Sequence, residues 1–160
     1  EIYNFETLRS RLLAAGHRFA SGTDTEVLVH LYEEHGDEMA RHLHGMFAFA
    51  IWDDRRRRLL LGRDRLGIKP LYYRTGSGSL TFASEVQALS AASDPVDLAA
   101  VRDLLRLGWV AGPRTIRAGI RELPPTRRMR SIPSIAMAGC CPLPSRIKIQ
   151  IRLSHEGGWR

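Results

Sequence analysis

Hydrophobic residues at helical spacing mark the first part of the chain. Between Asn4 and Gly16, one apolar stripe is formed by Leu8, Leu12 and Leu13. Asn is a favoured residue at a helix start and Gly at a helix end, so these bounds predict a helix.

A second amphipathic stretch follows a Ser-Gly-Thr-Asp turn and runs to Gly36. Thr23 or Asp24 is expected to cap this helix, and Glu26 lies three residues after Thr23, which is the spacing of a capping box. A third, shorter helix is expected over residues 37–44.

The period then changes to that of strands. Residues 46–52 are almost all apolar, which is typical of a strand buried on both faces. A turn at 53–56 leads into a returning strand at 59–64, so an antiparallel hairpin is expected. A second hairpin is predicted from strands at 69–74 and 80–83.

Two further helices are expected, one from Ser84 to about Ala91 and one that begins after Asp97. The apolar face of the latter consists of Leu98, Val101, Leu104 and Leu105. Helices, then hairpins, then helices indicate an α+β fold with helices packed on antiparallel sheet. The stretch 108–125 is predicted to be a connector.

Charge separates the last part of the chain from the rest. The 160 residues carry a net charge of +7, but residues 1–125 hold 17 basic and 16 acidic residues, whereas 126–160 hold seven and one. Because pattern and charge change together at residue 126, we expect an atypical basic tail that is disordered and arises from a shifted reading frame. The nearly neutral body argues against a nucleic-acid-binding protein.

The remaining composition excludes several classes of protein. No apolar run approaches the ~18 residues of a membrane helix, and no leader-like segment follows Glu1, so cytoplasm is the expected compartment. Cys140 and Cys141 are adjacent and lack the spacing of a zinc or redox site, and the six histidines show no ligand spacing. We therefore predict no metal ligands.

Five strings of sequence, in this order and spacing, carry a family resemblance: residues 1–4, 21–27, 45–53, 62–73 and 82–85. They closely resemble the glutaminase domain of glutamine-hydrolysing asparagine synthetases, class II glutamine amidotransferases, over about residues 1–125. The resemblance implies an N-terminal-nucleophile-type αββα sandwich, two antiparallel sheets between helical layers. Residues 1–107 would be an incomplete glutaminase domain, and 108–125 would lead toward a synthetase domain that is missing here.

The resemblance also implies two substrate-binding residues. Glu1 and Asp24 match the family's acids that hold the α-amino group of glutamine, and opposite charges suit that role. Asp24 has a second interpretation as a helix cap, and Glu1 as a frayed terminal residue. The family's nucleophilic cysteine, its carboxylate-binding arginine and its Asn-Gly oxyanion donors would all precede Glu1, so no catalytic residue is assigned and this chain is expected to be inactive alone.

The parent enzyme implied by the resemblance is a carbon–nitrogen ligase that uses glutamine as amido donor for aspartate. ATP and Mg²⁺ would act in its synthetase domain, and no cofactor is expected in this chain. Glutamine, the synthetase domain and a second copy in a homodimer are the expected partners. Two alternatives are a non-catalytic amidotransferase-like protein-interaction module and an arginine-rich nucleic-acid binder that uses the tail.

Overall fold

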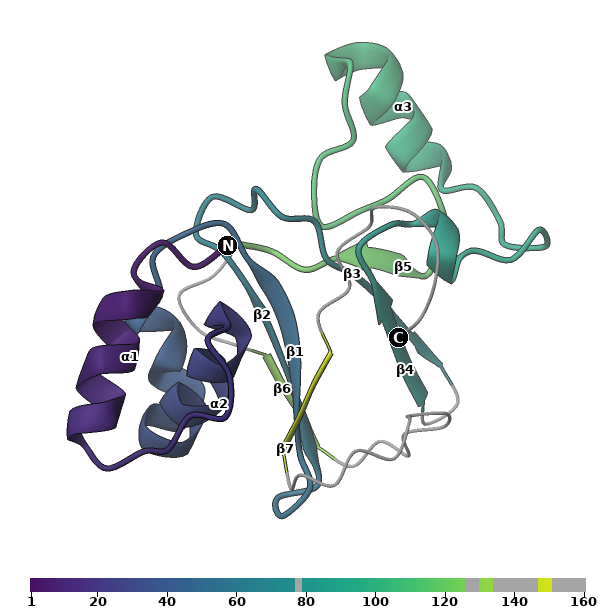
Figure 1. Ribbon diagram of the computed structural model, residues 1–160. Coiled ribbons are helices and arrows are strands. Elements are labelled where there is room, and N and C mark those ends of the chain that lie inside the picture. Colours follow the sequence, from purple (N-terminus) through teal and green to yellow (C-terminus); the bar gives the residue numbers. More distant parts are fainter. Residues whose placement is uncertain (77–78, 126–129, 134–146, 151–160) are drawn as a thin grey trace. The chain divides into compact units, whose positions relative to one another are not determined.

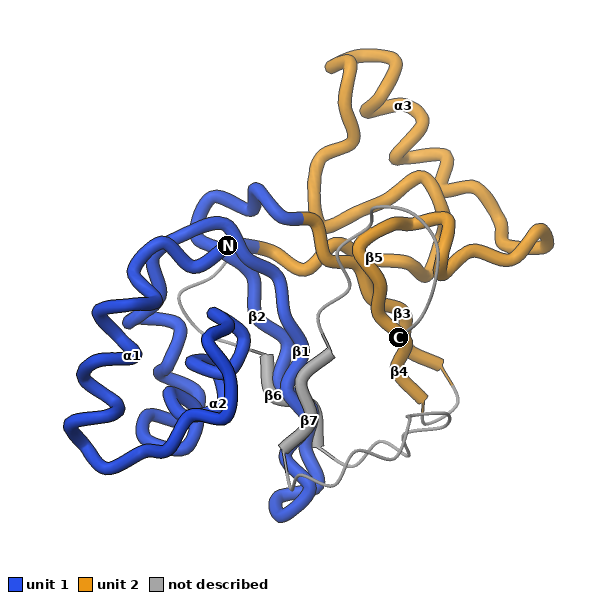
Figure 2. The backbone as a smooth tube through the Cα atoms, viewed as in Figure 1, with its two compact units in different colours: residues 1–69, 125–151 blue, residues 70–124, 152–160 orange. Residues whose placement is uncertain are grey.

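The computed structural model describes residues 1–76, 79–125, 130–133 and 147–150, with side chains described as far as residue 125. The chain divides into two compact units, coloured separately in Figure 2. Unit 1 comprises residues 1–69 and 125–151, and unit 2 comprises 70–124 and 152–160. Much of the predicted tail lies outside the described residues.

Unit 1 begins with two α-helices and a 3-10 helix, namely α1 (Phe5–Ala14), α2 (Asp24–His35) and η1 (Gly36–His42). The predicted stop of α1 at Gly16 is confirmed. Gly16 has a φ of +96°, and the Gly16 and His17 N–H groups donate to Leu13 O and Leu12 O, each at 3.0 Å. This is the double hydrogen bond of a Schellman motif.

Asn4 occupies the N-cap position of α1, as predicted. The Asn4 side chain makes no cap hydrogen bond. Its Nδ2 donates to His42 O (2.9 Å), and its Oδ1 accepts from His44 N (3.0 Å), so Asn4 ties the start of α1 to the end of η1.

The first predicted hairpin is confirmed. Strands β1 (Ala48–Asp53) and β2 (Arg58–Arg63) pair antiparallel from Ala48↔Arg63 to Asp53↔Arg58. Two strands from beyond residue 125, β6 (Arg130–Pro133) and β7 (Ile147–Gln150), complete a sheet of order β6-β2-β1-β7.

The core of unit 1 lies between this sheet and the helices beside it (Figure 1). Phe49, Ile51 and Leu60 point from the sheet into a buried cluster with leucines of α1 and α2. Ala50, Trp52, Leu59 and Leu61 alternate with them along the two strands and are buried too. The prediction of a strand buried on both faces is therefore confirmed for β1.

Unit 2 contains a three-stranded antiparallel sheet of order β4-β3-β5. Strands β3 (Tyr72–Gly76) and β4 (Ser79–Ala83) form the second predicted hairpin. Strand β5 (Ile120–Glu122) pairs with β3 and comes from the stretch expected to be a connector. A role of 108–125 in reaching a further domain stays a prediction.

The helix predicted from Ser84 to Ala91 is wrong, because only a short 3-10 helix, η2 (Gln87–Leu89), forms there. The backbone groups of this stretch bind elsewhere in unit 2. Leu89 O accepts from Arg74 Nη1 (3.1 Å), and Ala91 N donates to Asp94 Oδ2 (2.7 Å). Arg74 and Asp94 are themselves joined by a two-pronged ion pair. These tertiary contacts replace helical hydrogen bonds.

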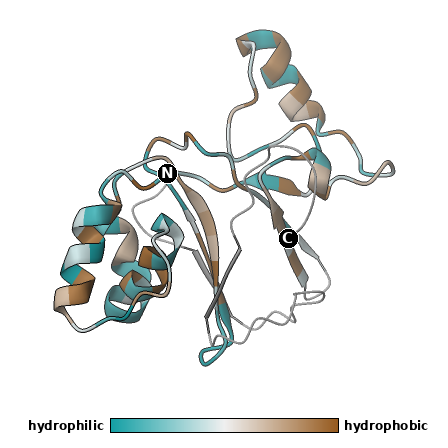
Figure 3. Cartoon of the chain, viewed as in Figure 1, coloured by the Kyte–Doolittle hydropathy of each residue, from teal (hydrophilic) through white to brown (hydrophobic). Residues whose placement is uncertain are grey.

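Helix α3 (Leu98–Leu107) is capped as predicted, because the Asp97 carboxylate accepts from Ala99 N and Ala100 N. Leu98, Leu104 and Leu105 on its apolar face are exposed. Figure 3 shows hydrophobic and hydrophilic residues alternating along this helix. Among the described residues, no helix combines the length and the apolar character needed to cross a membrane.

Candidate functional site

The segment that carries Glu1 is bound to the residues just before β1. Met46 N donates to Glu1 O (3.0 Å), Tyr3 N donates to His44 O (2.8 Å), and Ile2 forms an antiparallel bridge with Gly45. Gly45 has a φ of +144°, and a Cβ there would overlap Glu1 O and lie 3.0 Å from Tyr3 N. Only glycine allows this backbone approach without strain.

Asp24 reaches the same segment from the start of α2. Its Oδ2 accepts a hydrogen bond from Ile2 N (3.2 Å), so the structure brings Asp24 next to the residue that follows Glu1. Asp24 is half-buried, whereas Glu1 is exposed. Both predicted acids therefore belong to one small region of unit 1.

The interpretation of Asp24 as the N-cap residue of α2 is wrong. Thr23 occupies the N-cap position, and Asp24 is the first helical residue. A carboxylate in the first turn still stabilises the helix through its dipole. The Asp24 side chain is thus turned toward the Glu1 segment and keeps its electrostatic role in α2.

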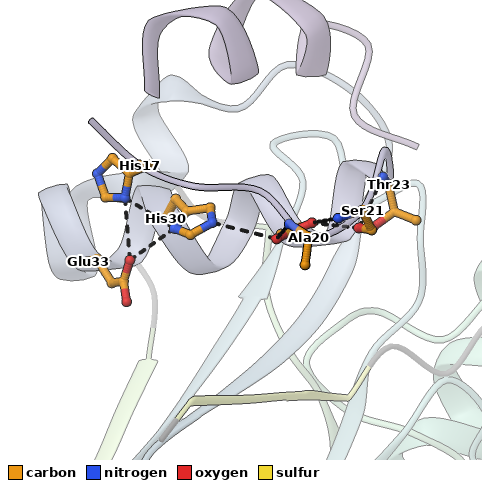
Figure 4. A network of polar contacts seen from close by, with 7 residues as sticks. His17, Ala20, Ser21, Thr23, His30 and Glu33 are labelled. Atoms are coloured by element: carbon orange, nitrogen blue, oxygen red, sulfur yellow. Dashed lines mark hydrogen bonds and ion pairs between the residues drawn. The ribbon is translucent and has the colours of Figure 1, made fainter. Parts of the chain in front are cut away.

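Glu26 organises the turn that leads into Asp24, and the sequence did not single it out for this role. Its carboxylate accepts from Ala20 N (2.6 Å), Ser21 N (2.7 Å) and Ser21 Oγ (2.6 Å), as Figure 4 shows for the labelled residues. In the predicted capping box, the Glu26 carboxylate would accept a hydrogen bond from Thr23 N instead. Burial disfavours the charged form, but these hydrogen bonds outweigh it and lower the pKa of Glu26.

A second ordered turn follows β2. The buried Asp64 carboxylate accepts from the N–H groups of Leu66 (3.1 Å), Ile68 (2.9 Å) and Lys69 (3.0 Å). Arg63 Nε donates to Lys69 O at 2.7 Å. Arg63, Asp64 and Lys69 thus form one network, in which Lys69 takes part through its backbone. This network shapes the turn at the end of the first segment of unit 1.

A pocket with a volume of about 320 Å³ lies in unit 2. Arg114, Arg117 and Arg121 line it together with Asp97. Neither Glu1 nor Asp24 contributes to it, so it does not correspond to the expected glutamine site.

The α+β arrangement of helices and antiparallel sheets is consistent with a glutamine amidotransferase domain. The glutamine amidotransferase domain family matches residues 1–136. Since this match covers most of the sequence, the chain belongs to that family.

Particular relatives are glutamine-hydrolysing asparagine synthetases. Asparagine synthetase 3 of Bacillus subtilis (strain 168) is 42% identical over 133 residues, which is 81% of this chain and 22% of the relative. Asparagine synthetase 3 of Arabidopsis thaliana is 50% identical over 91 residues, 56% of this chain and 15% of the relative. Asparagine synthetase 1 of B. subtilis is 39% identical over 127 residues. The chain thus spans about a fifth or less of the length of the curated relatives it matches.

Proposed function

We propose that this chain is part of the glutaminase portion of a cytoplasmic, glutamine-hydrolysing asparagine synthetase. The names of its relatives support this proposal, as does the family to which it belongs. In such an enzyme, ammonia released from glutamine would pass to a synthetase part that amidates aspartate. ATP and Mg²⁺ would act in that part, and no described residue is assigned to them. The fold of that portion would be an N-terminal-nucleophile-type αββα sandwich.

Within that portion, Glu1 and Asp24 would hold the α-ammonium group of glutamine. The observation that carries this proposal is the hydrogen bond from Ile2 N to Asp24 Oδ2, which fixes Asp24 one residue from Glu1. Two carboxylates on adjoining segments create a negative potential, and an ammonium group gains charge-assisted hydrogen bonds to both. The backbone contacts of Gly45 and Met46 keep the Glu1 segment in place for this task.

The test compares L-glutamine with glutaramate, which is the same molecule without the α-amino group. We expect the 160-residue chain to prefer L-glutamine by about 10- to 100-fold in isothermal titration calorimetry, the value of one or two charge-assisted hydrogen bonds. Asp24→Asn should remove most of that preference. Asp54→Asn is the matched control, because Asp54 is an exposed acid on the turn between β1 and β2.

Two results would contradict the proposal: equal affinity for the two ligands in the unaltered chain, or an equal loss in both variants. The alternative of a non-catalytic interaction module predicts the first of these results. Comparison of the two ligands therefore separates the alternatives without a need for turnover.

A further inference from the structure

Two histidines and a glutamate converge at a place in unit 1 that the glutamine proposal does not use. His17 follows the end of α1, whereas His30 and Glu33 lie one turn apart on α2. The His17 and His30 Nδ1 atoms are 3.1 Å apart, and Glu33 Oε2 lies 3.0 Å from His30 Nδ1 and 3.5 Å from His17 Nδ1. Figure 4 shows the three groups facing one another.

No placement of protons gives favourable hydrogen bonds between all three of these atoms, His17 Nδ1, His30 Nδ1 and Glu33 Oε2. A single N–H proton on either ring leaves a contact in which two lone pairs face each other. Protons on both Nδ1 atoms set two N–H groups against each other across 3.1 Å. A cation at the centre is attracted by all three atoms at once, because each then offers a lone pair.

The outer ring nitrogens favour the same arrangement. His17 Nε2 lies 3.1 Å from Glu34 Oε1, so its proton is held there and Nδ1 is left with a free lone pair. His30 Nε2 is buried and has no hydrogen-bond partner among the residues whose side chains are described, and Glu26 Oε1 is 3.8 Å away. Histidine ligands of metals commonly direct the second nitrogen to a carboxylate in this way.

The surroundings hold the His30 ring in position and leave one side of the cluster open. The Phe19 ring packs edge-on against His30 with centroids 4.5 Å apart. The His17 and His30 side chains are 18% and 13% exposed, whereas Glu33 is 44% exposed. Water can therefore reach a fourth coordination position beside Glu33.

We propose that His17 Nδ1, His30 Nδ1 and Glu33 Oε2 bind one Zn²⁺ ion, with water as the fourth ligand. Ligands of tetrahedral zinc, at 2.0–2.2 Å from the metal, lie about 3.3 Å from each other. The three separations of 3.0, 3.1 and 3.5 Å bracket that value. The proposed set has no short ligand motif in the sequence, because His17 and His30 are 13 positions apart.

The proposed ion would add a connection between two elements that already meet through the hydrogen bonds of Glu26 and Glu34. His17 belongs to the link between α1 and α2, and the other two ligands belong to α2. Bound zinc would therefore hold this link against α2, the helix that begins with Asp24. Because the ion binds only the folded arrangement, it should raise the unfolding temperature.

The test uses the full chain carrying Cys140→Ser and Cys141→Ser, so that thiolates do not bind the metal. Zinc affinity is measured by competition with a chromophoric chelator, and the geometry by the visible absorption of bound Co²⁺. We expect one Zn²⁺ per chain and a zinc-dependent rise in unfolding temperature. Mg²⁺ should have no effect, because it prefers oxygen ligands.

Three variants decide the assignment. Glu34→Gln removes an outer carboxylate and should weaken zinc binding by ~10- to 100-fold. Glu33→Gln and His30→Gln each remove a proposed ligand, so they should weaken zinc binding by more than that. His44→Gln is the matched control, since His44 is exposed and not part of the cluster. Glu33 is half-exposed, so its variant should fold even where the His30 variant does not. The proposal would be overturned if zinc did not bind or stabilise the chain with both cysteines replaced. Equal losses of zinc affinity in Glu33→Gln and His44→Gln would overturn it too.

Discussion

Gly45 allows the Glu1 segment to lie against the backbone that precedes β1. Its positive φ and the closeness of Glu1 O, Ile2 Cα and Tyr3 N leave no room for a side chain. The Ile2–Asp24 hydrogen bond depends on the same segment. A residue without functional groups thus determines whether the two acids stay together.

Gly45→Ala should therefore separate Glu1 and Ile2 from Asp24. We expect a loss of about 1–3 kcal/mol in the free energy of unfolding, typical of overpacking, and a reduced preference for L-glutamine over glutaramate. Chemical denaturation and calorimetry measure the two effects. Gly22→Ala is the control, because a Cβ at Gly22 meets nothing within 4 Å. Unchanged ligand preference in Gly45→Ala would show that the segment does not position the site.

Asp64 illustrates how one buried carboxylate replaces regular structure in a turn. Burial raises its pKa, but the hydrogen bonds from Lys69, Ile68 and Leu66 N–H prevail and lower the pKa below the ordinary value of 3.8. Because the folded-state pKa is lower than that of the unfolded chain, the contribution to stability is complete above the ordinary pKa. It is lost as pH falls through the folded-state pKa.

Asp64→Asn should accordingly destabilise the chain by about 1–3 kcal/mol at pH 7, since charged acceptors of several backbone bonds are lost. The difference from the unaltered chain should shrink as pH is lowered below 3.8. Urea denaturation at a series of pH values measures this. Asp54→Asn, at an exposed position, should stay within about 0.5 kcal/mol at every pH. A pH-independent loss in Asp64→Asn would exclude the carboxylate as its cause.

At the scale of elements, α2 and α3 differ in what their leucines contact. Leu28 on α2 is 1% exposed and belongs to the core of unit 1, whereas Leu105 on α3 is 81% exposed. The bounds of α3 are set by the Asp97 cap and by Gly108, which takes the left-handed conformation at its end.

Replacing one leucine by alanine in each helix should reveal this difference in packing. Leu28→Ala should cost about 2–5 kcal/mol through lost burial and a residual cavity. Leu105→Ala makes the same change in helix propensity but should stay within about 0.5 kcal/mol. Circular dichroism during urea denaturation measures both. A similar cost at the two positions would mean that α3 packs against other parts of the chain in solution.

Elements with local signals were predictable, and those held by distant contacts were not. Helix α1 and the β1–β2 hairpin follow from periodicity, turn residues and Gly16 within a few positions of each bound. The stretch after Ser84 has the composition of a helix, yet Arg74 and Asp94 capture its backbone groups, and no local pattern reports that. Asp24 was found through the family resemblance. Its contact with Ile2, 22 positions away, and the approach of Gly45 depend on tertiary structure.

At the scale of the whole molecule, each unit builds its own antiparallel sheet. The sheet of unit 1 includes strands from both sides of unit 2 in the sequence, because β1 and β2 precede residue 70 whereas β6 and β7 follow residue 124. Removing residues 126–160 would therefore take two strands from that sheet. The expectation of a disordered, atypical tail stays a prediction, and within it the structure describes β6 and β7 as strands.

The last prediction concerns the chain as a single polypeptide: it should bind glutamine without hydrolysing it. The family resemblance implies a cysteine whose thiol attacks the amide while its own α-amino group acts as base. The two thiols of the printed sequence belong to Cys140 and Cys141, whose nitrogens are in peptide bonds and therefore cannot act as the base. Ammonia and glutamate release from L-glutamine should equal a blank, in the same samples in which calorimetry detects binding. Turnover above the blank that survives Cys140→Ser and Cys141→Ser would require a nucleophile other than a thiol. Turnover that disappears with those substitutions would instead assign catalysis to the cysteine pair.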